Sequence, residues 1–207
     1  MEDLGAASDN QVILAWLQAE IESPEFQTYV VGDPPEPANL SRAMTLARKP
    51  DLDSAEQNAA RREIIAAAHG FGRGAMIFAG LSDDITWRRV RVSMREVGQM
   101  LYANRNAAWT TLAPKTRTVA EGAGNAGQLY AGDDTNMHVL GLAGTLCHTD
   151  PVPVLPAIIC LRGLDGRVIV MEGHTRATAF VIEAHRFPDG VDAYLGETTS
   201  IANWAYL

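Results

Sequence analysis

Apolar residues recur at helical spacing near the start of the chain. The stripe consists of Val12, Ile13, Trp16, Leu17 and Ile21. It predicts a helix that Asp9 or Asn10 caps and that ends before Pro24. A helix of this kind buries its apolar face against a core and leaves its other face to water.

Two further helical patterns follow in the same half of the chain. They cover residues 41–48 and 54–69. Pro-rich residues 32–37 should form an extended, exposed link, and glycine-rich residues 70–74 should end the last of these helices. We therefore expect residues 1–80 to form a helical N-terminal region.

The pattern then changes to alternation. Residues 85–92 alternate and are rich in β-branched and aromatic side chains, which predicts a strand. Ser93 and Glu96 have the spacing of a capping box, so a helix is expected over residues 93–102. Residues 104–135 are rich in Gly, Ala, Asn and Thr and are expected to form a long loop, in which a short helix is the alternative. A loop of that length in a compact domain is either functional or a sign of missed structure.

The C-terminal third gives the clearest pattern. The expected elements are a helix at 134–144, strands at 157–161 and 167–171 joined by a tight turn, a helix at 177–186, a strand at 191–195 and a closing helix at 198–206. The predicted fold class is α+β. A small mixed sheet with packed helices occupies residues 81–207, and the helical N-terminal region precedes it.

Composition narrows the class of protein. The chain has 207 residues, of which 47% are hydrophobic, so it can bury a substantial core. No apolar run is long enough to span a membrane, and the N-terminus has no signal-peptide pattern. Two cysteines do not make a disulfide framework, so we expect reduced thiols and a cytoplasmic location. The net charge of -8 argues against general nucleic-acid binding.

The candidate chemistry lies at residues 172–176, here called the junction, between a hydrophobic strand and a helix start. Its residues are Glu172, Gly173, His174, Thr175 and Arg176. The first N–H groups of a helix are unpaired and favour an anion. Gly173 lets the backbone approach a ligand, Arg176 can grip a phosphate bidentately, and His174 can donate a hydrogen bond or a proton. The alternative is an ordinary turn whose His and Arg have no ligand.

Residues 157–195 resemble the core of the ParB/sulfiredoxin-like superfamily. Its members include the N-terminal domains of partition proteins, sulfiredoxins and free-serine kinases. They share a strand, a turn, a second strand and a junction with Gly, His and Arg that opens a helix, written here as VIVMEGHTRATA at 168–179. The resemblance implies phosphate contacts from Gly173, His174, Thr175 and Arg176. It extends to about 81–207 through the strand and capped helix upstream.

The chain departs from these relatives in several respects. It lacks the second arginine-rich motif and the helix-turn-helix domain of partition proteins, and its charge counts against a nuclease acting on DNA. Sulfiredoxins carry their nucleophilic cysteine inside the junction, where this chain has none. Cys160 lies on the preceding strand and should be buried and inert. Several relatives have Asp where this chain has Glu172.

Two other groups of polar residues have candidate chemistry. Arg89 and Arg91 share one face of their strand and could extend the anion site, with Arg88 and Arg95 nearby. Their alternative role is a solvated strand edge that discourages aggregation. The second group comprises His138, His148, Asp150 and His174, in which no pair has a recognised metal-ligand spacing. We predict no metal site there.

The first functional hypothesis is a nucleotide- or phosphate-binding enzyme that performs phosphoryl transfer or hydrolysis on a small molecule. Its cofactor would be ATP or another nucleotide with Mg²⁺. Arg176 would neutralise phosphate charge, His174 would orient the phosphate or transfer a proton, and Glu172 would hold Mg²⁺ or act as a base. The alternative is a non-enzymatic interaction or regulatory module. Its helical N-terminal region would dock a protein partner or a second copy of the chain.

Overall fold

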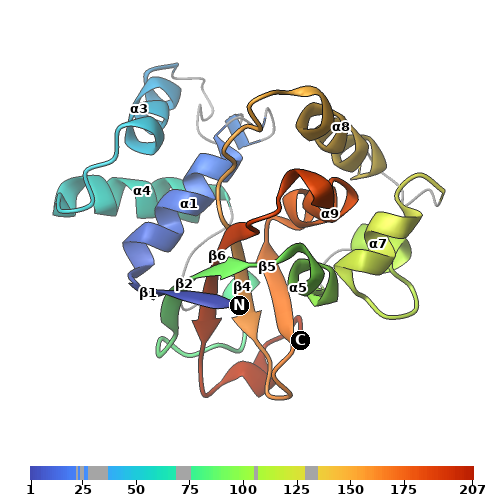
Figure 1. The fold of residues 1–207 in the computed structure, drawn as a ribbon. Coiled ribbons are helices and arrows are strands. Elements are labelled where there is room, and N and C mark those ends of the chain that lie inside the picture. Colours follow the sequence, from blue (N-terminus) through green and yellow to red (C-terminus); the bar gives the residue numbers. More distant parts are fainter. Residues whose placement is uncertain (22, 24–25, 28–36, 69–75, 105–106, 129–134) are drawn as a thin grey trace.

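A six-stranded mixed sheet forms the centre of the computed structural model, with helices against both faces (Figure 1). The structure describes residues 1–21, 23, 26–27, 37–68, 76–104, 107–128 and 135–207. The strands are β1 (Glu2–Ala7), β2 (Thr86–Val92), β3 (Leu101–Tyr102), β4 (Ile158–Arg162), β5 (Val168–Glu172) and β6 (Val191–Glu197). The helices are α1 (Asp9–Glu20), α3 (Pro37–Arg48), α4 (Ala55–Ala68), α5 (Met94–Gln99), α6 (Ala107–Leu112), α7 (Val119–Asn125), α8 (Thr135–His148) and α9 (His174–Ile182).

The strand order across the sheet is β1-β2-β6-β4-β5-β3. The pairs β1/β2, β2/β6 and β4/β5 are antiparallel, whereas β4/β6 and β3/β5 are parallel. The expected hairpin is therefore present as β4 and β5, and its turn has Gly166 at a φ of 78°. This arrangement confirms the coarse prediction of a mixed α/β protein with a mixed sheet.

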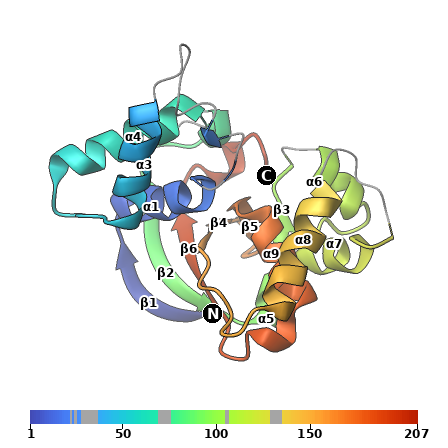
Figure 2. The ribbon, with the colours of Figure 1, turned by 90° about the horizontal axis from the view of Figure 1, so that it is seen from above.

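Strands β4 and β5 are buried on both faces. In β4, Ile158 and Cys160 face one hydrophobic cluster, and Ile159 and Leu161 face the other. The first cluster includes residues of α5 to α9, and the second includes residues of α1, α3 and α4. Seen from above, these two groups of helices lie on opposite sides of the strands (Figure 2). Apolar burial on both faces explains why β4 and β5 are almost uniformly hydrophobic.

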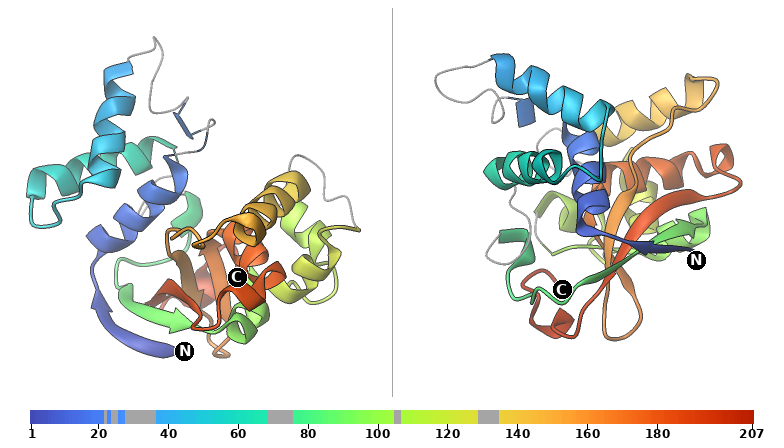
Figure 3. Two further views of the ribbon diagram at one scale, coloured as in Figure 1. Left: turned by 45° about the horizontal axis from the view of Figure 1, so that its top comes forward. Right: turned by 90° about the vertical axis from the view of Figure 1, so that its left-hand side faces the viewer.

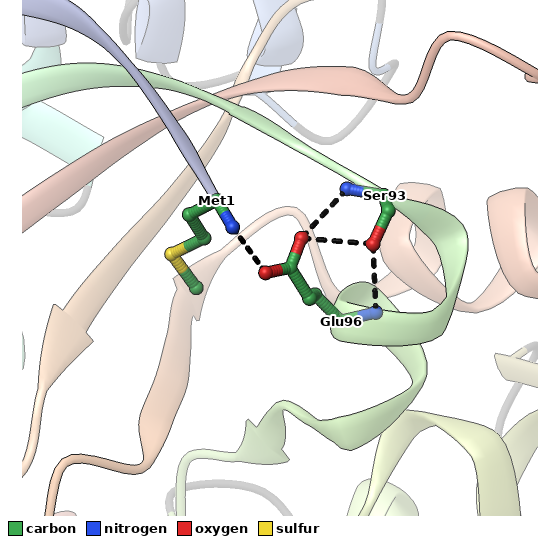
Figure 4. Close-up of polar contacts among 3 residues, drawn as sticks. All are labelled: Met1, Ser93 and Glu96. Atoms are coloured by element: carbon green, nitrogen blue, oxygen red, sulfur yellow. Dashed lines mark hydrogen bonds and ion pairs between the residues drawn. The ribbon is translucent and has the colours of Figure 1, made fainter.

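Side-chain caps fix where two helices begin. The predicted capping box of α5 is confirmed, because Ser93 accepts from the Glu96 backbone while the Glu96 carboxylate accepts from Ser93 (Figure 4). The same carboxylate also binds the Met1 ammonium group. Helix α1 is capped by Ser8 rather than by Asp9 or Asn10, since Ser8 forms its own capping box with Gln11. Asp9 instead accepts a 3.0 Å hydrogen bond from the Trp87 indole.

The sequence predicted a helical region over residues 1–80, but the structure also has a strand there, β1. β1 forms the outer edge of the sheet by pairing with β2, and it owes its conformation to that partner rather than to its own residues. The expected helix over 93–102 is also too long. It ends at Gln99 because Leu101 and Tyr102 form β3 against β5. The domain boundary at residue 80 remains a prediction, but α1, α3 and α4 share one core cluster with β4 and β5.

The predicted long loop at 104–135 contains two short helices, α6 and α7. Thr118 caps α7, and Trp109, Leu112 and Val119 are buried in the core. Burial therefore stabilises helices that local propensity disfavours. The closing helix predicted at 198–206 is only a 3₁₀ turn, η3 (Ile201–Asn203). Two further 3₁₀ turns are η1 (Met76–Phe78) and η2 (Ala184–Arg186).

Some expectations fall elsewhere. The glycine-rich stop at 70–74 and the Pro-rich residues 32–36 lie outside the described residues. Within the described part of the chain, none of the helices has the length and apolar character needed to cross a membrane.

Cross-strand ion pairs join β2 to β6. Arg89 and Arg91 both donate to Asp192, the latter through Nε at 2.7 Å. Burial raises the pKa of the Asp192 carboxyl, but these two hydrogen bonds and the arginine charges outweigh it and hold the pKa below its usual range. Both arginines thus have a carboxylate partner on the neighbouring strand. The alternative role as a solvated strand edge is wrong, because β2 lies between β1 and β6 and the edge strand is β1.

This pairing predicts a pH-dependent stability. The pKa of Asp192 in the folded state is below the unfolded value of about 3.9, so its pairs stabilise the fold above that pH. The stabilisation is lost as the pH falls through the folded-state pKa. Asp192→Asn should cost about 0.5–1 kcal/mol at neutral pH, since both arginine side chains are more than a third exposed and water weakens their ion pairs. It should also lose less stability than wild type between about pH 5 and pH 2.

Urea unfolding at several pH values would measure this difference. Asp189→Asn is the matched control, because Asp189 is exposed in the preceding turn and has no ion pair within the described residues. Parallel pH profiles for wild type and Asp192→Asn would contradict the prediction.

Candidate functional site

The junction turns β5 directly into α9. β5 ends at Glu172, and Gly173 is the N-cap of α9 with φ 93° and ψ 29°. The helix begins at His174, three residues earlier than the predicted residue 177. His174, Thr175 and Arg176 therefore occupy its first turn. Neither a side-chain cap nor an acidic residue serves this helix start.

Gly173 meets two requirements that a larger residue would not. Its φ is in the left-handed region, which favours glycine. A Cβ placed on it would lie 2.7 Å from Nη2 of Arg176 and 3.0 Å from Cγ2 of Ile158. The guanidinium of Arg176 therefore folds back over the glycine, directly beside the start of α9.

Arg176 is held in place by one ion pair. Its Nη2 donates to Oε1 of Glu172 at 3.3 Å, and the two side chains are only 12% and 19% exposed. Its Nε is buried and has no hydrogen-bond acceptor in the described part of the chain. A guanidinium has five N–H donors, so most of the N–H groups of Arg176 make no hydrogen bond to the described residues. A cation beside the positive end of a helix dipole is a combination that a bound anion would stabilise.

Two aromatic side chains fix the orientation of the His174 ring. The ring stacks on Trp109 with a centroid distance of 5.3 Å and on Tyr102 at 5.8 Å. The Tyr102 hydroxyl lies 2.7 Å from the Thr178 hydroxyl, which donates to the carbonyl of His174, also at 2.7 Å. Burial raises the pKa of Tyr102 well above its usual range, so the phenol stays neutral. The stacked rings and these hydrogen bonds together fix the position of the first turn of α9.

The junction lines a cleft of about 550 Å³, which we call the junction cleft. Its lining residues come from both helical layers, from α1 and from α8 and α9. In the ribbon, α1 lies on one side of the strands and α8 and α9 on the other (Figure 3). The lining residues are Gln18, Ala19, Glu20, Ser23, Trp109, His138, Leu142, Leu155, Pro156, Glu172, Gly173, His174, Thr175 and Arg176. This volume is in the range of small-molecule sites.

All five junction residues predicted from the sequence are thus brought to one cleft, but Arg89 and Arg91 are not. Those two arginines pair with Asp192 and do not line the cleft, so their predicted contribution to an anion site has no support in this arrangement. A separate cavity of about 290 Å³ near β3 contains Arg117 and Arg167. Arg117 donates to the Tyr102 carbonyl at 2.9 Å, and Arg167 pairs with Asp165.

The other reactive side chains add little to the site. His138 lines the junction cleft together with His174, whereas His148 and Asp150 do not. Within the described ranges no three His, Cys, Asp or Glu side chains gather closely enough to hold a metal ion. Cys160 is fully buried, and burial raises the pKa of its thiol, as expected for an inert cysteine.

Sequence reasoning missed the opposite wall of the cleft. Gln18, Glu20 and Ser23 come from the end of α1 and the residues after it. Gln18 and Glu20 are polar residues in the last turn of α1, and Ser23 follows the helix. In a sequence, such residues are indistinguishable from solvent-facing ones. Trp109 lies within residues 104–135, which the sequence predicted to be a long loop.

The chain was compared with protein-family models, curated proteins and solved structures. No protein-family model, no curated protein and no solved structure matches this chain.

The junction geometry predicts that Gly173→Ala is unusually costly. A left-handed alanine costs about 1–2 kcal/mol, and the close contacts should add at least about 1 kcal/mol and displace Arg176. The matched control is Gly166→Ala, because Gly166 has a φ of 78° but no atom within 4 Å of its Cβ position. Denaturant unfolding measures both variants. Equal losses would show that the contact with Arg176 has no energetic effect.

The hydrogen-bond chain behind His174 gives a second prediction. Thr178 is fully buried, so Thr178→Val should cost about 1–3 kcal/mol by leaving the Tyr102 hydroxyl unpaired. Thr178→Ser keeps the hydroxyl and should lose less. Thr145→Val is the control, because Thr145 makes a similar bond to the Gly141 carbonyl at an exposed position. If Thr178→Val proved as stable as Thr145→Val, the hydrogen bonds that link Tyr102, Thr178 and His174 would not stabilise the fold as predicted.

Proposed function

We propose that the protein is a nucleotide- or phosphate-binding enzyme that performs phosphoryl transfer or hydrolysis on a small molecule. The phosphate would bind at the junction. The observation that carries this proposal is the meeting of an uncapped helix start with a largely unused, poorly exposed guanidinium in one cleft. Both groups are donors and both favour negative charge.

Each junction residue has a role in this proposal. Arg176 and the first N–H groups of α9 neutralise the phosphate. His174, whose ring is fixed by stacking, orients the phosphate or transfers a proton. Gly173 provides the close approach, and Thr175 adds a hydroxyl at the cleft wall.

Glu172 is first of all the partner of Arg176. It could also be a ligand for Mg²⁺ bound with ATP or another nucleotide. Mg²⁺ in phosphate sites is often held by one or two carboxylates, with phosphate oxygens and water as its other ligands. One carboxylate beside the proposed phosphate position fits that pattern. The metal would then depend on the nucleotide, in keeping with the absence of a three-ligand group among the described residues.

The resemblance to the ParB/sulfiredoxin-like superfamily supports the same site. That family places phosphates at the helix start of the corresponding junction. The membership itself is part of the proposal. The order strand, Gly173, first turn with His174 and Arg176 is the feature on which it rests.

The alternative, a non-enzymatic module that docks a partner or a second copy through residues 1–80, has less support. Helices α1, α3 and α4 use their apolar faces in the core. Among the described residues of this region, the large apolar side chains that are exposed are Met1, Leu4 and Met76, on β1 and η1. This is not an apolar patch on the helices.

Thermal unfolding with a panel of nucleotides, with and without Mg²⁺, tests the proposal. At a ligand concentration about a hundredfold above its Kd, linkage predicts roughly 2.7 kcal/mol of stabilisation and a rise in Tm of several degrees. Arg176→Ala should abolish the rise. Arg95→Ala is the control, since Arg95 is an exposed arginine outside the cleft. A flat panel for folded wild-type protein would exclude nucleotides as ligands.

A further inference from the structure

The wall of the junction cleft opposite α9 is the carboxyl end of α1. Gln18 and Glu20 belong to its last turn, and Ser23 follows shortly after. This turn contains no basic residue, and Glu20 adds a carboxylate to the negative end of the helix dipole. The cleft therefore lies between two helix ends of opposite sign, because the other wall has the positive end of α9 and Arg176.

The hydrogen-bonding capacity of this wall is mainly that of an acceptor. The Gln18 amide nitrogen donates to the carbonyl of Ala47 at 3.0 Å, which leaves its oxygen facing away from that bond as an acceptor. The Ser23 hydroxyl accepts from the Phe26 backbone N–H at 3.4 Å. A carboxylate such as Glu20 is acceptor only when ionised. Groups that donate hydrogen bonds, such as hydroxyls and ammonium ions, are the natural complement of this wall.

Apolar side chains also line the cleft. Trp109, Leu142 and Leu155 line the cleft along with the polar groups. The volume of about 550 Å³ is far larger than a phosphate ion requires. The space thus fits a ligand with a carbon skeleton between two polar ends.

We infer that the cleft recognises a two-ended small molecule. Its phosphate lies at the junction, and its other end, a hydroxyl or ammonium group, is bound by Glu20 with Gln18. This inference rests on the proposed phosphate site and assigns to the N-terminal region a role in substrate specificity. Glu20 is here a specificity-determining residue.

Three phosphate esters that share a two-carbon chain test the inference. They are ethyl phosphate, 2-hydroxyethyl phosphate and O-phosphoethanolamine, which end in a methyl, a hydroxyl and an ammonium group. Calorimetric titration of wild-type protein should give at least fivefold tighter binding for one or both donor-bearing esters than for ethyl phosphate. A preference for the amine would indicate an ion pair with Glu20, and a preference for the alcohol a hydrogen bond.

Two variants separate this inference from the proposed function. Glu20→Gln should abolish the preference and leave ethyl phosphate bound at least as tightly, because a negative charge is removed. Arg176→Ala should weaken all three esters. Glu63→Gln, an exposed glutamate of α4 away from the cleft, is the control and should change nothing.

Each remaining outcome is decisive. Equal affinity of wild type for the three esters, or a preference that survives in Glu20→Gln, would overturn the inference while the phosphate site stands. Failure of folded wild-type protein to bind any ester would overturn the phosphate site as well.

Discussion

The left-handed turn at Gly173 is the constraint on which the junction cleft depends. β5 is paired on both sides, with β4 and with β3, and buried on both faces, so its end at Glu172 is fixed. α9 must then leave the sheet at once in order to pack on one face. A positive φ achieves this change of direction within one residue, and the missing side chain leaves room for the Arg176 guanidinium. One backbone conformation thus sets the positions of the helix start, the arginine and its carboxylate partner.

Much of the fold was predictable where local pattern and tertiary environment agree. The stripe of α1, the alternation of β2, the Ser93–Glu96 capping box and the β4/β5 hairpin are all visible in the sequence and present in the structure. The failures have a common cause. β1 contains few strand-forming residues and β3 is only two residues long, and both exist because neighbouring strands pair with them. α6 is stabilised by the burial of Trp109. Pairing and burial are properties of the whole chain, so short windows do not contain them.

The candidate site divides in the same way. The junction is contiguous, and a strand followed by Gly, His and Arg at a helix start has a chemical meaning that can be found in a sequence. The opposite wall is about 150 residues away along the chain, and nothing in α1 distinguishes Glu20 from any other surface glutamate. Arg89 and Arg91 illustrate the reverse error. Their spacing in the sequence suggested an anion site. In the structure both guanidinium groups form ion pairs with Asp192 on β6, which is the neighbouring strand but lies about a hundred residues later in the sequence.

The edge strand β1 has a consequence for how the molecule assembles. Ala7 pairs with Trp87, eighty residues later, so this pairing closes a loop that contains α1, α3 and α4. Closing so long a loop has a conformational entropy cost that local contacts do not offset, which raises the contact order and slows folding. β1 therefore stays unpaired until β2 is available, and it completes its structure later than the helices inside the loop, whose hydrogen bonds are local.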